Sequence, residues 1–174
     1  MLLFACATAQ AADGIEIISA SIKAADDGYR LEARYAFELN PSLETALQKG
    51  VAFSFTTEID LTRPRWYWTD DPAVSSRRPV RLDYDVLTRV YHLSAQGSLR
   101  QTFDTLDEAL FYIRRPPAWQ IAPKGALKPG ETYNVQLRMY MDRDLMAKPL
   151  QVDALNNADL RLATPKKTFP YRAE

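Results

Sequence analysis

The 174-residue sequence is poor in the residues that most often carry chemistry: it has one cysteine, one histidine and six glycines. A lone Cys6 and a lone His92 provide neither a disulfide pair nor the Cys and His groups that bind zinc or copper. No Gly-x-Ser-x-Gly motif accompanies His92, and no glycine-rich loop suited to phosphate occurs. We therefore expect no cofactor, no metal site and no catalytic residue.

An excess of charge of one sign is also missing, because 22 Lys and Arg residues balance 22 Asp and Glu residues. Such a chain has no overall electrostatic field that attracts nucleic acid. An apolar run of 18 residues is absent as well, so we expect no transmembrane span in the mature chain. A hydrophobic content of 47% is typical of an ordinary globular domain.

The first residues carry the one targeting signal in the sequence. Small residues at Ala9 and Ala11 fit the rule for signal-peptidase cleavage, although the basic start and most of the apolar stretch of a signal peptide are missing. We interpret residues 1–12 as a remnant of a secretion signal and residues 13–174 as a single domain. The expected location is the periplasm or another exported site, and lipid attachment at Cys6 is disfavoured because only two apolar residues precede the acylation box Leu3-Phe-Ala-Cys6.

Alternation of apolar and polar residues with a period of two dominates the rest of the chain. It predicts strands over residues 29–39, 51–61, 133–142 and, as one long strand, 80–94. Each predicted strand has one polar face, which is typical of antiparallel sheets with one side in water. The apolar phase of these strands predicts a core that includes Phe53, Phe55, Tyr84, Val86, Val135, Leu137 and Met139.

Two short helices interrupt this pattern. Asn40 and Ser42 are candidate caps for a helix that ends near Gly50, and Thr105-Leu-Asp-Glu108 is a capping box for a helix that ends near Arg114. We therefore predict an all-β fold class, a single immunoglobulin-like antiparallel β-sandwich with two short helices.

Two pairs of carboxylates lie two residues apart, Glu58 with Asp60 and Asp83 with Asp85. A glycosidase uses two carboxylates at a similar separation, but it places them on opposite sides of a sugar in a cleft. Neighbouring carboxylates on one polar strand face usually form a solvated ladder with arginines. A carboxylate-based hydrolase is therefore the least favoured of the functions considered.

The segment Arg63-Pro-Arg-Trp-Tyr-Trp-Thr-Asp-Asp71 concentrates aromatic, basic and acidic residues. Pro64 cannot donate a ladder hydrogen bond, so we expect this segment to lead into an exposed sheet edge. Two interpretations of Trp66 and Trp68 stay open: they plug the end of the sandwich as part of the core, or they lie on a surface open to a partner.

A series of short motifs extends over residues 15–170, namely Ala46-Leu-x-x-Gly50-Val, Phe53-x-Phe-x-x-Glu58, Arg65-Trp-Tyr-Trp-x-Asp70, Arg81-Leu-x-Tyr84, Leu87-Thr-Arg89-x-Tyr91 and Phe103-x-x-Leu106-x-Glu-Ala-Leu110. In these motifs the chain resembles a family of exported proteobacterial proteins catalogued only as a domain of unknown function. Members of that family are often encoded near a nitrogen-regulation-type sensor kinase. The resemblance implies an exported, sandwich-like protein and supplies no activity or catalytic residue.

Our leading hypothesis is a non-enzymatic exported module that binds a protein partner at the cell envelope, such as the extracytoplasmic part of a sensor. A peripheral contact with the membrane is left open. The alternative is binding of a small ligand or lipid in a cleft between the sheets, lined by Trp66, Trp68, Tyr84 and Tyr91. The residues that we expect in the protein interface are Arg63, Arg65, Trp66, Trp68, Asp70, Arg89 and Tyr91.

Overall fold

The computed structural model describes residues 14–67, 69–142 and 162–174. The predicted signal remnant, Cys6 and Trp68 lie outside these residues. Within them the chain forms, in order, β1 (Glu16–Ala25), β2 (Gly28–Ala36), α1 (Pro41–Gln48), β3 (Phe53–Arg63), β4 (Asp71–Asp85), β5 (Val90–Ala95), β6 (Gln101–Phe103), α2 (Leu106–Arg114), β7 (Trp119–Pro123), β8 (Thr132–Met141) and β9 (Lys167–Arg172).

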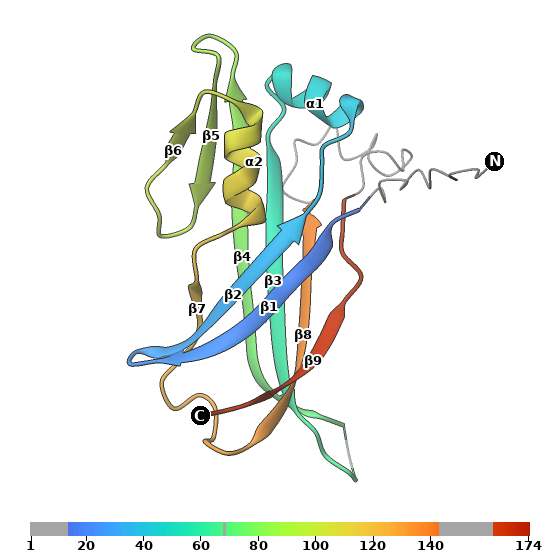
Figure 1. Ribbon diagram of the computed structural model, residues 1–174, viewed down its shortest axis with the longest axis vertical. Coiled ribbons are helices and arrows are strands. Elements are labelled where there is room, and N and C mark those ends of the chain that lie inside the picture. The colour runs from blue at the N-terminus through green and yellow to red at the C-terminus, as the bar shows by residue number, and fades with distance from the viewer. Residues whose placement is uncertain (1–13, 68, 143–161) are drawn as a thin grey trace, which may run out of the picture.

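The strands form two antiparallel sheets, which confirms the predicted fold class of a mainly β sandwich with two short helices. The smaller sheet has the order β1-β2-β7 and the larger one β6-β5-β4-β3-β8-β9. Figure 1 shows the smaller sheet running diagonally across one face of the larger sheet, with α1 at the upper end of the molecule. Strands β3 to β6 are consecutive neighbours, so each pair is joined by a local connection.

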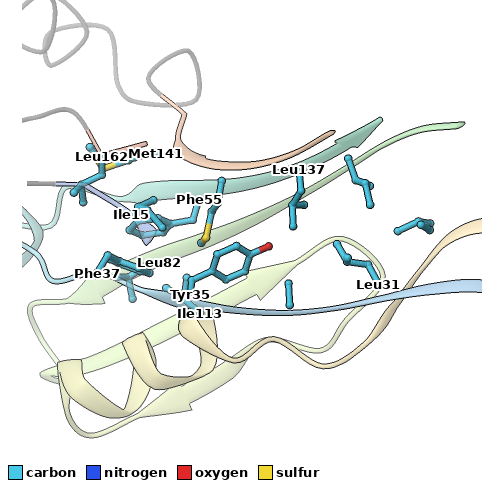
Figure 2. Packing of buried hydrophobic residues seen from close by; sticks show 14 of the residues in the cluster. Ile15, Leu31, Tyr35, Phe37, Phe55, Leu82, Ile113, Leu137, Met141 and Leu162 are labelled. Carbon is cyan, nitrogen blue, oxygen red and sulfur yellow. The ribbon is translucent and has the colours of Figure 1, made fainter. Parts of the chain in front are cut away.

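The core lies between the two sheets and follows the predicted apolar phase. Figure 2 shows Phe55 and Leu137 of the larger sheet packed near Leu31 and Tyr35 of the smaller one. Burial raises the pKa of Tyr35 to about 12, although its hydroxyl group shares a hydrogen bond with that of Thr57, 3.4 Å away. The predicted core residues that are buried are Phe53, Phe55, Val135, Leu137 and Met139.

The prediction of one strand over residues 80–94 is wrong, and with it the prediction that Val86 is buried. Strand β4 ends at Asp85, whose Oδ1 accepts hydrogen bonds from the backbone N–H groups of Leu87 at 2.9 Å and Thr88 at 3.1 Å. These bonds lower the pKa of Asp85. Arg89 takes a left-handed conformation with φ of 59°, and the chain reverses into β5. Val86 is therefore 55% exposed in a tight turn, whereas Tyr84, still within β4, is partly buried against the core.

The two helices begin where their caps predict. The Asn40 side chain accepts a hydrogen bond from the Leu43 backbone N–H at 2.9 Å, and Leu43 is fully buried. Thr105 and Glu108 form the complete capping box of α2. Leu110 and Ile113 on the inner face of α2 join the core, so this helix is fixed against the sandwich and presents its other face to solvent.

Candidate interaction site at the β3–β4 hairpin

The segment rich in Trp and Arg connects β3 to β4, and we call its described residues, 63–67 and 69–71, the hairpin tip. The two strands pair from Phe53 opposite Leu82 to Arg63 opposite Asp71, and they are central strands of the larger sheet. The predicted exposed sheet edge is therefore wrong. Pro64 follows the last residue of β3, where no ladder hydrogen bond is required of it. In Figure 1 the hairpin tip projects at the end of the molecule opposite α1.

Two adjacent aromatic side chains stand in solvent at the hairpin tip. Trp66 is 95% exposed and Tyr67 is 65% exposed. Their rings meet edge to face, with 5.2 Å between the ring centroids. Trp66 is thus not part of the core, and its position agrees with the open-surface interpretation of this residue. Its predicted companion, Trp68, lies outside the described residues.

The base of the hairpin tip is held by two arginines that share one carboxylate. Nη2 of Arg63 lies 2.8 Å from Oδ2 of Asp71, and Nη2 of Arg65 lies 2.6 Å from the same oxygen. The hydrogen bond from Arg65, together with that from Arg63, holds the pKa of Asp71 below its ordinary value. Both guanidinium groups therefore fix the connection between the strands. Elsewhere in the described chain, Arg78 and Arg115 lie over the rings of Trp119 and Phe111.

Asp70 ties the hairpin tip to its neighbouring strands. Oδ2 of Asp70 accepts a hydrogen bond from the Thr62 hydroxyl at 3.3 Å and from Nδ2 of Asn134, on β8, at 3.4 Å. The two arginines of the hairpin tip pair with the neighbouring Asp71. The residues that flank Trp66 and Tyr67 are consequently held to the larger sheet by several hydrogen bonds and ion pairs.

The other two predicted interface residues lie at the far end of β4. Arg89 is exposed in the turn after Asp85, and Tyr91 is buried in β5, where its ring packs 4.7 Å from that of Tyr84. Strand β4 has 15 residues, so about 50 Å separates its ends. The structure therefore does not bring Arg89 and Tyr91 to the hairpin tip. For the same reason Trp66, Tyr84 and Tyr91 do not line a common cleft.

The polar face of the larger sheet carries a ladder of ion pairs. Glu58 on β3 accepts hydrogen bonds from Nε and Nη2 of Arg77 at 3.1 Å and from Arg138 on β8. Burial raises the pKa of Glu58, but the hydrogen bonds from the two arginines outweigh it and lower the pKa below its ordinary value. Glu58 therefore carries its charge at neutral pH and joins three strands, which is poorly suited to the work of a general acid.

A second surface feature has no counterpart in the sequence predictions. A hollow of about 520 Å³, which we call the α2 hollow, opens to solvent between β6 and the outer side of α2. Its main lining residues are Phe103, Asp104, Asp107, Glu108, Phe111 and Tyr112. The sequence carries one signal for this hollow, because Phe111 and Tyr112 are large aromatic residues outside the buried stripe of α2. The packing of β6 beside α2 is a tertiary feature that the sequence pattern does not show.

Two findings concern membrane spans and metal sites in the part of the chain that the structure describes. No helix there is long and apolar enough to cross a membrane. No three His, Cys, Asp or Glu side chains among the same residues gather in a group suited to a metal ion.

A protein-family model matches residues 12–170, and its description is Domain of unknown function (DUF4390). Neither a curated protein nor a solved structure matches the chain. The match covers all the described strands but β9, whose last residues lie beyond it.

Proposed function

The chain belongs to the DUF4390 family, whose function is unknown, and we propose that it is a non-enzymatic module that binds a protein partner in the cell envelope through the hairpin tip. The small residues Ala9 and Ala11 support export, which would bring the folded chain into the envelope. The interface takes in Arg63, Arg65, Trp66 and Asp70, with Tyr67 added.

The exposure of Trp66 beside Tyr67 is the observation that carries this proposal. Single exposed apolar residues are ordinary on a protein surface, but two adjacent large aromatic rings at the end of a projecting hairpin are not. Trp and Tyr are frequent anchors of interfaces because they bury much area and have few rotatable bonds to immobilise.

The polar contacts of the hairpin tip support the same conclusion. Asp71 holds Arg63 and Arg65, while Asp70 is bonded to Thr62 and Asn134. A base fixed in this way reduces the entropy lost when the tip is ordered in a complex. The charges of the two arginines and two aspartates balance, so affinity would come mainly from the aromatic rings.

The test is to immobilise the wild-type protein, capture its partner from a detergent extract of native membranes, and measure affinities with the purified partner. Trp66→Ala should weaken binding about thirtyfold or more, because truncation of an interface anchor costs roughly 2 kcal/mol or more. Its melting temperature should be unchanged within a few degrees, since a side chain this exposed contributes little to the core.

Leu87→Ala is the matched control, because Leu87 is 94% exposed in the turn at the opposite end of β4. Equal affinities of the two variants would contradict the proposal. Binding of the wild-type protein to pure phospholipid vesicles, lost in Trp66→Ala without any protein partner, would instead assign the hairpin tip to the membrane surface.

A further inference from the structure

The α2 hollow lies on a different part of the molecule from the hairpin tip. It is formed where β6, at the edge of the larger sheet, meets the outer side of α2. Its volume of about 520 Å³ is in the range of cavities that hold small molecules or single side chains of a partner. The hollow is open to solvent, so a group on another protein can enter it.

Aromatic rings form the apolar wall of the hollow. The rings of Phe103 and Tyr112 lie 5.2 Å apart, and Phe111 continues the wall along the helix. Phe111 and Tyr112 are 50% and 43% exposed. The guanidinium group of Arg115 lies over Phe111, 4.6 Å from the ring centroid, so one aromatic face here already holds a cation.

Carboxylates also line the hollow. Glu108 accepts a hydrogen bond from the backbone of Thr105 as part of the capping box. Asp104 and Asp107 are exposed, and within the described residues neither side chain forms a hydrogen bond or ion pair. By contrast, Glu58 and Asp71 elsewhere on the surface each hold two arginines. Three acidic side chains thus line the hollow, and Arg115 lies beside it over the ring of Phe111.

We propose that the α2 hollow binds an arginine side chain from a basic segment of a partner protein. A planar guanidinium group stacks on an aromatic face and donates paired hydrogen bonds to a carboxylate, so it suits both kinds of lining side chain. An anionic ligand would be repelled by the carboxylates, and an apolar one would leave them without partners. This inference does not depend on the role of the hairpin tip.

The experiment is a titration of the isotope-labelled full chain with a capped tetra-arginine peptide, followed through backbone amide chemical shifts. Saturable shifts should be confined to the amides of residues 102–115. A capped tetra-glutamate peptide should leave them unchanged. Shifts spread evenly over the surface would overturn the proposal, because they would indicate general attraction of a polycation.

Charge-matched variants make the test specific. Asp104→Asn combined with Asp107→Asn should weaken peptide binding at least tenfold. Asp26→Asn combined with Glu131→Gln, two exposed positions away from the hollow, should leave the affinity within about twofold, although the net charge changes equally. Equal weakening in both double variants would overturn the assignment of the site.

A second variant keeps the proposal testable if the loss of Asp107 disturbs the first turn of α2. Phe111→Leu retains apolar bulk but removes the aromatic face, and Phe111 is half exposed, so folding should be preserved. Its affinity for the peptide should fall at least threefold. An unchanged affinity would show that the aromatic wall takes no part in binding and would overturn the stacked arrangement.

Discussion

The guanidinium group of Arg78 on β4 lies over the ring of Trp119 on β7, with 5.9 Å between the guanidinium carbon and the ring centroid. Nη1 of Arg78 also donates a hydrogen bond to the backbone oxygen of Pro117 at 3.1 Å. One side chain of the larger sheet thereby reaches the edge strand of the smaller sheet. Burial lowers the pKa of Arg78, so the attraction of the ring and the carbonyl must offset a desolvation cost.

Arg78→Met should lower the free energy of unfolding by about 1–2 kcal/mol, because both the cation–π contact and the hydrogen bond are lost while the bulk is kept. Urea denaturation measures this change. Arg81→Met is the control: Arg81 points to the other face of β4 and lies 3.8 Å from Asp83, so its loss should cost within about 0.5 kcal/mol. An equal cost at both positions would show that Arg78 does not link the sheets.

Leu137→Ala should lower the free energy of unfolding by about 2–5 kcal/mol, because Leu137 is fully buried between the sheets and its truncation leaves a cavity. The adjacent Gln136 faces the polar side of β8, where it accepts a hydrogen bond from Lys166. Gln136→Ala should therefore cost within about 0.5 kcal/mol. A larger loss for Gln136→Ala than for Leu137→Ala would mean that the two faces of β8 have been assigned the wrong way round.

The ion pairs of Glu58 should make stability depend on pH. Since the folded pKa of Glu58 is lowered, its contribution is fully present above the unfolded pKa of about 4.3 and is lost as the pH falls through the folded pKa. Glu58→Gln should thus be less stable than the wild type by about 1–3 kcal/mol at pH 7, and the difference should shrink towards zero in acid.

Urea denaturation at several pH values between about 7 and 2.5 checks this expectation. Asp60→Asn serves as the comparison, because Asp60 lies on the same strand face and has no ion pair within the described residues. A gap between Glu58→Gln and the wild type that stays constant over the whole range would rule out the proposed charge dependence.

Thr105→Ala should destabilise the start of α2, because it removes the acceptor for the Glu108 backbone N–H in the capping box. A loss of about 1 kcal/mol is expected. Hydrogen exchange should become faster at the amides of residues 109–114, which the cap helps to protect. Ser98→Ala, in the exposed loop before β6, should leave these rates unaltered.

Local sequence patterns predicted the parts of the fold that depend on local rules. Alternation identified β2, β3 and β8, and the caps at Asn40 and Thr105 identified both helices. The error at Val86 has a physical cause. The turn after Asp85 contains no glycine or proline, and Val86 and Val90 continue the alternation of apolar and polar residues, so the turn looks like a strand in the sequence. Arg89 takes a left-handed conformation in which glycine is the usual residue, and a glycine at this position would have predicted the turn.

The candidate site was harder to predict, because exposure and proximity are tertiary properties. Alternation could not decide whether Trp66 points into the core, since the residues around it lie in a connection and not in a strand. The prediction placed Arg89 in the same interface, on the outward face of a strand, yet the length of β4 puts it far from Trp66. The α2 hollow requires β6 and α2 to meet, which no motif in either element encodes.

The central position of β3 and β4 has a mechanical consequence. Hydrogen bonds of antiparallel strands run perpendicular to the strand axis, and the pair is bonded to β8 on one side and to β5 on the other. A tension applied to Trp66 along the strand axis would load these two ladders in shear, so that their bonds resist together and do not open one after another. The β3–β4 hairpin is therefore the part of the sandwich best suited to resist a pulling force applied at its projecting end.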